Sequence, residues 1–306
     1  MILLSKEAIA EWFKKLQKDI CTALETEVGK EKFLIDAWEH AHGGGGISTI
    51  MQNGNVIEKG GVNFSAVSGQ VPKFLLSENK HSITSKTSVE NTFFATGVSI
   101  VIHPQNPMVP IIHMNVRYFE TNNGVWWFGG GIDLTPHYVN DMDATFFHQQ
   151  LKHICDKHDA NYYPKFKQWA DDYFYIPHRK ETRGIGGIFF DRLTGSDTNS
   201  KEKMFAFVQD VGKSFAPTYV ELIKRNKQKQ FTDTQKNWQL LRRGRYVEFN
   251  LVYDKGTQFG LQTDGRIESI LMSLPQYASW QYNFIPDENS EEQRTLNLLK
   301  KGVVWL

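Results

Sequence analysis

Two segments that lie close together in the chain contain the residues best suited to chemistry, because their polar side chains are two or four residues apart. Residues 97–103 and 111–119 are otherwise rich in apolar and β-branched residues, which is typical of β-strands. Because successive side chains of a strand alternate between its faces, the polar residues of each segment share a face. They are Ser99 and His103 in the first segment and His113, Asn115 and Arg117 in the second. This combination predicts a pocket wall that holds an anion and moves protons.

The histidines leave two kinds of chemistry open. His103 and His113 lie on predicted strands joined by a short loop, so their faces can coincide, and His148 and His178 from the helical region could share a metal with them. No pair of histidines has the spacing of a His-Glu-x-x-His or Cys-His metal motif. Neutral histidines at the two strand positions could equally act as acid or base near pH 7.

Asp133 is the carboxylate with the most informative surroundings. It follows the glycines 129–131 and the pair Trp126-Trp127, so the backbone can approach a ligand there beside an aromatic surface. A turn or capping aspartate ahead of the following Thr-Pro is the alternative interpretation.

Three other motifs do not have the pattern of a nucleotide or nucleic-acid site. Gly43–Gly46 lack the lysine of a P-loop and predict a flexible turn. Arg183-Gly-Ile-Gly-Gly187 has neither the spacing nor the βαβ context of a dinucleotide fingerprint and predicts a tight turn beside an arginine. Arg242-Arg-Gly-Arg245 is too small a basic cluster to indicate nucleic acid.

The overall composition narrows the class of protein. The 306 residues carry a formal net charge of +1, so an anionic ligand must be bound by a local cluster rather than a global field. No stretch approaches the length of a membrane span, and the first apolar run is too short for a signal peptide. The two cysteines, Cys21 and Cys155, lie far apart and indicate a reducing compartment. We therefore expect a cytoplasmic protein with no membrane span and no nucleic-acid partner.

The pattern of elements predicts one α+β domain over residues 1–306, with a large antiparallel sheet flanked by helices. An amphipathic helix is expected over about 5–28, and further helical segments over 141–175 and 201–229. Strands are expected around 47–51, 55–59, 62–67, 97–103, 111–119, 245–253 and 258–263, with residues 124–136 forming a strand that enters a glycine-rich bend.

Six segments, in order, resemble the oxygen-dependent coproporphyrinogen III oxidase family, and the likeness extends over roughly residues 33–285. The segments are 58–65, 101–107, 113–119, 126–136, 180–191 and 242–254. The resemblance implies oxidative decarboxylation of two propionates of coproporphyrinogen III to vinyl groups, which gives protoporphyrinogen IX in haem biosynthesis. Dioxygen is the co-substrate, no organic cofactor is needed, and CO2 and hydrogen peroxide are released. It also implies helices on both faces of the sheet and a homodimer with residues about 246–280 at its interface.

The resemblance implies roles for particular residues as well. His113 falls on the position of the proton donor. The substrate-binding positions fall on Ser99, Asn115, Val116, Arg117, Asp264, Gly265 and Arg266. A divalent metal, such as manganese, is implied at His103, His113, His148 and His178.

The residue types suit this chemistry. Arg117 and Arg266 are natural clamps for propionate carboxylates, because a guanidinium binds a carboxylate with two hydrogen bonds. Aromatic residues 126–128 suit pyrrole faces, and Asp133 is our candidate for removing or holding a pyrrole proton so that the ring reacts with dioxygen. A tetrapyrrole carrier without turnover and a His-cluster metallohydrolase are the alternatives. The carrier would need neither Asp133 nor His113.

Overall fold

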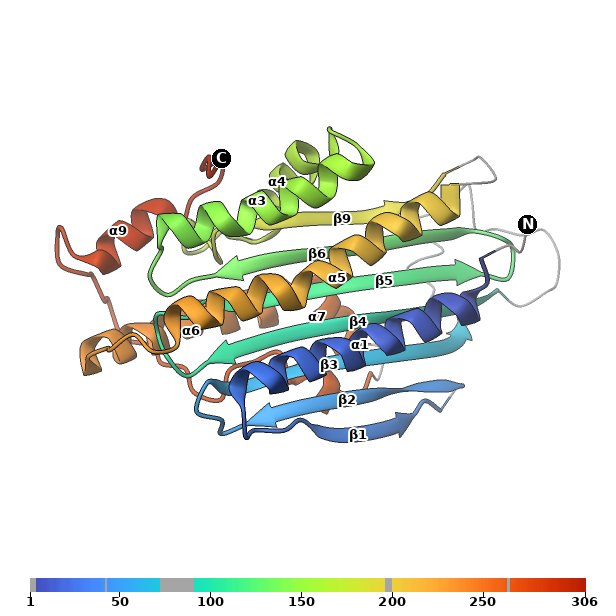
Figure 1. Ribbon diagram of the computed structural model, residues 1–306, viewed down its shortest axis with the longest axis horizontal. Helices are drawn as coiled ribbons and strands as arrows, with labels where there is room; N and C mark the ends of the chain where they lie inside the picture. Colours follow the sequence, from blue (N-terminus) through green and yellow to red (C-terminus); the bar gives the residue numbers. More distant parts are fainter. Residues whose placement is uncertain (1–3, 42, 72–90, 196–199, 263–264) are drawn as a thin grey trace.

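The computed structural model describes residues 4–41, 43–71, 91–195, 200–262 and 265–306, which are organised around an antiparallel β-sheet (Figure 1). In these residues the sheet has seven strands in the order β1-β2-β3-β4-β5-β6-β9, so strands that follow one another in sequence are paired. They are β1 (Leu34–Glu39), β2 (Gly44–Gln52), β3 (Ile57–Gln70), β4 (Thr92–Pro104), β5 (Ile111–Thr121), β6 (Trp126–Thr135) and β9 (Gly187–Leu193).

Helices cover both faces of this sheet, which confirms the predicted α+β class. Figure 1 shows α1, α3, α4 and α5 in front of the sheet and α6 and α7 behind it. The helices are α1 (Lys6–Val28), α3 (Asp141–His158), α4 (Tyr162–Tyr173), α5 (Ser200–Asn226), α6 (Asp233–Val252), α7 (Lys255–Gln262), α8 (Ile267–Leu271) and α9 (Glu291–Leu298). A small separate hairpin pairs β7 (Tyr175–Ile176) with β8 (Glu181–Thr182).

The N-terminal helix forms as predicted. Its cap is Ser5, whose hydroxyl accepts a hydrogen bond from the backbone N–H of Ala8, and it ends at Gly29, whose φ of +92° suits glycine. Apolar residues at helical spacing, such as Ile9, Phe13 and Leu16, are buried against the sheet.

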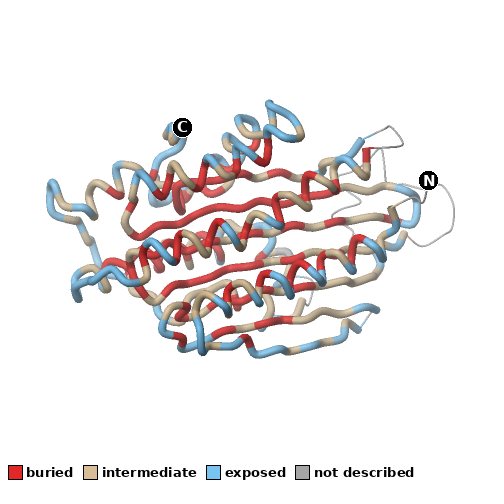
Figure 2. The backbone as a smooth tube through the Cα atoms, in the orientation of Figure 1, coloured by how far each residue is buried: buried red, intermediate tan, exposed pale blue. Residues whose placement is uncertain are grey.

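The face of the sheet under α1 and α5 forms the hydrophobic core. Strand alternation places the even-numbered residues of β3 to β6 on this side, which we call the core face. Figure 2 shows long buried stretches along the central strands and on the sides of α1 and α5 that face them. The buried core-face residues of these strands are Val62, Phe64, Val98, Ile100, Ile102, Ile112, Met114, Val116, Tyr118, Phe128, Ile132 and Leu134.

Two of the predicted strands are wrong. Residues 245–253 and 258–263 were expected to be extended, but residues 245–252 lie in α6 and 258–262 lie in α7, and residue 263 is outside the described part of the chain. Helix α6 begins twelve residues earlier with a capping box between Thr232 and Gln235, and its buried residues recur at helical spacing. The aromatic and β-branched residues of this stretch mimic a strand locally, but burial of one helical stripe decides the outcome.

The glycine-rich segments also differ from expectation. Gly44–Gly46 were predicted in a flexible turn, but they begin β2 and pair with β1 and β3. Glycines 129–131 likewise lie inside β6 rather than in a bend. The turn predicted at residues 183–187 is confirmed, since Gly186 has a φ of +76°.

Candidate active site

The odd-numbered residues of β3 to β6 face away from the core, and this polar face carries the residues singled out above. The register pairs Val101 with His113, Ser99 with Asn115, and Gly97 with Arg117. Ser99, His103, His113, Asn115 and Arg117 therefore share one side of the sheet, as predicted.

The register extends this arrangement across the sheet into a continuous line of polar side chains, which we call the polar row. Each member stands directly opposite the next on the neighbouring strand, so the row runs at right angles to the strands. It consists of Asp36 on β1, Ser48 on β2, Asn63 on β3, Ser99 on β4 and Asn115 on β5. With strands about 4.8 Å apart, the row is roughly 19 Å long. Its members on β1, β2 and β3 were not recognised in the sequence.

Arg117 lies beside the polar row in a trough made by glycines. Gly97 on β4 and Gly129 on β6 stand opposite it on its two sides. Its guanidinium donates hydrogen bonds to Asn115 Oδ1 and Asp191 Oδ1, both at 2.7 Å. A Cβ atom at Gly129 would lie 2.5 Å from that Asp191 oxygen and 2.9 Å from Arg117 Cζ. The glycine therefore lets the arginine–aspartate pair lie flat on the strand.

His113 is held by a buried carboxylate. Its Nδ1 lies 2.8 Å from Asp133 Oδ1, on the adjacent strand of the register. A carboxylate only accepts, so Nδ1 carries the proton and Nε2 is the nitrogen available for proton transfer. Asp133 is only 1% exposed, whereas the His113 side chain is 20% exposed. Through His113, the carboxylate is linked to the surface of the polar face.

Arg183 completes this group, and sequence reasoning did not assign it. It donates to both oxygens of Asp133 at 2.8 Å and to Asn250 Oδ1 at 2.8 Å. Its guanidinium lies 4.4–4.7 Å from three ring centroids, those of Phe174, Tyr246 and Phe249. Burial raises the pKa of Asp133, but Arg183 and His113 outweigh burial, so the pKa of this carboxyl lies below its usual value.

Arg266, at the start of α8, reaches the other end of the polar row. It forms an ion pair with Asp36, and its guanidinium lies 3.3 Å from Ser48 Oγ. The adjacent Gly265 donates its N–H to the carbonyl of Gly260. Asp264, the remaining member of the predicted substrate-binding stretch, lies outside the described residues.

A comparison with protein families places this site in a known context, since a family model described as coproporphyrinogen III oxidase matches residues 8–305. The chain belongs to the coproporphyrinogen III oxidase family. It is 49% identical over 299 residues to an oxygen-dependent coproporphyrinogen-III oxidase of Drosophila melanogaster, and the alignment covers 95% of this chain and 76% of the relative. The oxygen-dependent coproporphyrinogen-III oxidase of Homo sapiens, named mitochondrial, is 51% identical over 301 residues, and the alignment covers 95% of this chain and 65% of the relative. Coproporphyrinogen-III oxidase 1 of Arabidopsis thaliana, named chloroplastic, is 47% identical over 298 residues, and the alignment covers 95% of this chain and 76% of the relative.

In this coproporphyrinogen III oxidase family member, the three aromatic residues expected together are divided between the two faces. Trp127 lies on the polar face, where its ring stacks on Phe119 at 4.2 Å, and Phe119 stacks in turn on Phe93 at 5.4 Å. Phe128 is fully buried in the core, and Trp126 packs against the same core. Only Trp127 of the three adds aromatic surface to the polar face.

Val116 also belongs to the core face. Its side chain is fully buried between the sheet and the helices in front of it. Only its backbone could take part in binding at the polar face.

The four histidines predicted as metal ligands are not brought together. His103 and His148 are fully buried, and they bind the carbonyls of Ser273 and Ile185. His178 pairs with Glu248 and Tyr253 instead. His148 lies on α3, which packs on the core side, whereas His113 lies on the polar face. In the described parts of the chain, no three His, Cys, Asp or Glu side chains are grouped to hold a metal ion.

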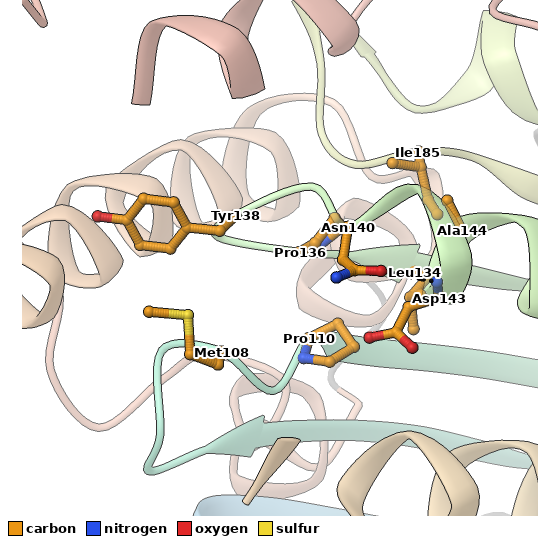
Figure 3. Close-up of a pocket in the computed structure, with 9 residues that line it drawn as sticks. All are labelled: Met108, Pro110, Leu134, Pro136, Tyr138, Asn140, Asp143, Ala144 and Ile185. Atoms are coloured by element: carbon orange, nitrogen blue, oxygen red, sulfur yellow. Dashed lines mark hydrogen bonds between the residues drawn. The ribbon is translucent and has the colours of Figure 1, made fainter. Parts of the chain in front are cut away.

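A small cavity lies at the end of β6, and Figure 3 shows the residues around it. It is lined by Met108, Pro110, Leu134, Pro136, Tyr138, Asn140, Asp143, Ala144 and Ile185. Leu134 belongs to the core face, so this cavity is separate from the polar face. Its volume of about 10 Å³ is enough for one water molecule only.

Proposed function

We propose that this chain catalyses the oxygen-dependent oxidative decarboxylation of coproporphyrinogen III to protoporphyrinogen IX. Each of two propionate groups loses CO2 and becomes a vinyl group, and dioxygen takes up two hydrogens as hydrogen peroxide. The carboxyl carbon leaves as CO2 with its two oxygens, so both oxygens of dioxygen end in the peroxide. Family membership and the names of the relatives support this reaction.

The observation that carries the proposal is the coincidence of the polar row with two arginines and a carboxylate-held histidine on one face. Arg117 and Arg266 reach this face from β5 and α8, near opposite ends of the row. The length of the row, about 19 Å, is comparable to the span of a tetrapyrrole with its propionate arms. The two arginines would bind propionates, while Ser99, Asn115 and the backbone of Val116 and Gly265 would position the macrocycle.

His113 is our candidate for proton transfer. With Nδ1–H fixed on Asp133, Nε2 can accept a proton from a pyrrole N–H as the electron-rich ring reacts with dioxygen. The imidazolium formed can then supply a proton to the departing peroxide. Asp133 would stabilise that imidazolium, as a carboxylate does for the histidine of a catalytic triad.

This geometry changes the role that we propose for Asp133. Both of its oxygens bind Arg183, one also binds His113, and the side chain is 1% exposed, so a pyrrole cannot contact it in this arrangement. We therefore assign Asp133 as a positioning residue that acts through His113. Asp133→Asn should strongly reduce turnover and leave substrate binding largely intact, and near-normal turnover would contradict this role.

The decisive experiment uses metal-stripped protein and coproporphyrinogen III, with and without oxygen. Product is followed by chromatography of the divinyl compound, and hydrogen peroxide is measured in parallel. Oxygen-dependent product without added metal supports the proposal, with one peroxide for each vinyl group formed. Tight binding without product would support a carrier, and product only after manganese addition would restore the metal hypothesis.

We further propose that the chain forms a homodimer through residues about 246–280. Large apolar side chains are exposed on this stretch of α6 to α8 and the segment after it, which supports an interface there. They are Leu251, Val252, Leu261, Ile267, Tyr277 and Trp280. Light scattering on the intact chain and on Ile267→Asp tests this, since the variant should shift the protein toward a monomer.

For localisation we propose the cytoplasm. Cys21 and Cys155 are both free thiols, which supports a reducing compartment. The human and Arabidopsis relatives are named mitochondrial and chloroplastic. Among the described residues, the structure contains no helix with the length and apolar character needed to cross a bilayer. Fluorescence imaging of the tagged full-length protein in its own cells tests the proposal.

A further inference from the structure

Arg117 and Arg266, which lie near the two ends of the polar row, are each paired with an aspartate from an edge strand of the sheet. Asp191 on β9 binds Arg117, and Asp36 on β1 binds Arg266. Strands β1 and β9 are the two edge strands of the described sheet, so the two aspartates lie at opposite ends of the polar face. These two carboxylates stand where an anionic ligand would have to approach.

These pairs differ in exposure from the buried pair of Asp133 and Arg183. The Asp191 side chain is 33% exposed and its partner Arg117 is 37% exposed, whereas Asp133 and Arg183 are 1% and 2% exposed. An ion pair in contact with solvent contributes little net stability and can be exchanged, but removing one partner from a buried pair is costly. The Arg117–Asp191 pair is therefore exchangeable.

The geometry leaves Arg117 able to bind a second carboxylate. Its Nη2 donates to Asp191 and its Nη1 donates to Asn115. A guanidinium has five N–H groups, so further donors remain. Gly129 lies directly under the pair, and because it has no side chain, nothing there pushes the arginine and the aspartate apart. An arriving propionate would therefore share Arg117 with Asp191 and be opposed by its negative charge.

We infer that Asp191 is a positioning residue that holds Arg117 in place and competes with the substrate propionate for it. The inference rests on the proposed function. If two propionates of one molecule react at a single His113, the macrocycle must leave its contact with Arg117 and turn to a new orientation between the two reactions. Competition from Asp191 speeds the loss of that contact, so the partly reacted compound with three carboxylates can turn and react again instead of staying in its first orientation.

The test compares Asp191→Asn with Asp191→Glu, which keeps the charge, and with the control Asp210→Asn. Asp210 on α5 has the same 33% side-chain exposure and pairs with His158 on the other side of the sheet. The probe is coproporphyrin III, the fluorescent oxidised macrocycle with the same four carboxylates, titrated by fluorescence anisotropy. Reaction intermediates are separately quantified by chromatography in single-turnover experiments.

We expect Asp191→Asn to bind coproporphyrin III roughly two- to fivefold more tightly, because a partly exposed competing charge is removed. KM and kcat should both fall, and the three-carboxylate intermediate should accumulate. Asp191→Glu keeps the competing charge and should therefore not gain affinity for coproporphyrin III, and Asp210→Asn should stay close to the parent. Unchanged or weaker binding of coproporphyrin III by Asp191→Asn would overturn the inference. The binding titration does not require turnover, so a failure of the proposed function would be recognised separately from a failure of this competition.

Discussion

The two faces of the central sheet divide stability and chemistry between alternate residues of the same strands. On β5, Met114 is fully buried against the helices in front, whereas its neighbour His113 reaches the polar face. Because strand side chains alternate strictly, the core and the site share a backbone but no side chains. One face can therefore hold closely spaced charged groups while the other retains an apolar core. Substitutions at adjacent positions should consequently differ in kind, with loss of activity on one side and loss of stability on the other.

His113→Ala should give the largest change, and it should affect activity only. General acid–base catalysis contributes about 10²- to 10⁴-fold to a rate, so kcat should fall by that order. The free energy of unfolding should change by less than about 1 kcal/mol, since His113 is partly exposed and Asp133 keeps Arg183. Turnover assays and urea unfolding measure both. His153→Ala, at an exposed histidine of α3, is the control. A loss of stability with normal kcat would show that the imidazole has only a structural role.

Met114→Ala should have the opposite effect. Removing a fully buried methionine lowers the free energy of unfolding by about 2–5 kcal/mol, through lost burial and a residual cavity. The folded fraction should keep kcat and KM close to those of the parent. Met142→Ala, whose side chain is 75% exposed, is the control and should be nearly neutral. A selective fall in kcat of the folded protein would mean that the two faces are not independent.

The alternation behind this comparison could be predicted from the sequence because it is a local property. Polar residues two or four apart between apolar ones identified the polar face of β4 and β5 without any knowledge of the partners. The same local reasoning failed at residues 245–253, where aromatic and β-branched residues imitate a strand but pack as one stripe of α6. A local pattern does not show what an element packs against.

The partners of the site could not be predicted, because they come from distant parts of the chain. Arg183 is 50 residues from Asp133, and Asp191 is 74 residues from Arg117. The polar row likewise depends on the register of five strands, which no single segment encodes. The resemblance to a family indicated substrate-binding positions but not the aspartates that hold the arginines.

The histidines give a pH test of the comparison. His148 is buried between Tyr163 and the carbonyl of Ile185, and burial lowers its pKa to about 4. The unfolded chain, with a histidine pKa near 6.5, binds the proton more readily, so stability is lost as pH falls from about 6.5 to 4. His148 should account for about 3 kcal/mol of this loss.

Urea unfolding at several pH values, on the parent and on His148→Gln, measures that contribution by difference. The difference is needed because the pKa values of buried His103 and His137 are also lowered. The variant should lose less stability on acidification and keep its turnover at pH 7. If the parent and the variant showed the same pH dependence, the structural role of His148 would be contradicted. A loss of turnover that manganese reverses would support the predicted metal site of four histidines.

The smallest predicted effects come from two adjacent glycines of β6 on opposite faces. In Gly129→Ala, the new methyl group meets the ends of two side chains, Asp191 and Arg117, which can shift. We expect a several-fold change in KM and little change in stability.

In Gly130→Ala, the new methyl group meets the backbone carbonyl of Asn115 at 2.6 Å and the Phe190 ring at 2.8 Å, which cannot easily move. That variant should lose about 1–3 kcal/mol of stability with KM unchanged. Urea unfolding and steady-state kinetics on the two variants compare the polar face and the core face with a single methyl group. Equal effects of the two variants on KM would show that strain passes through the sheet.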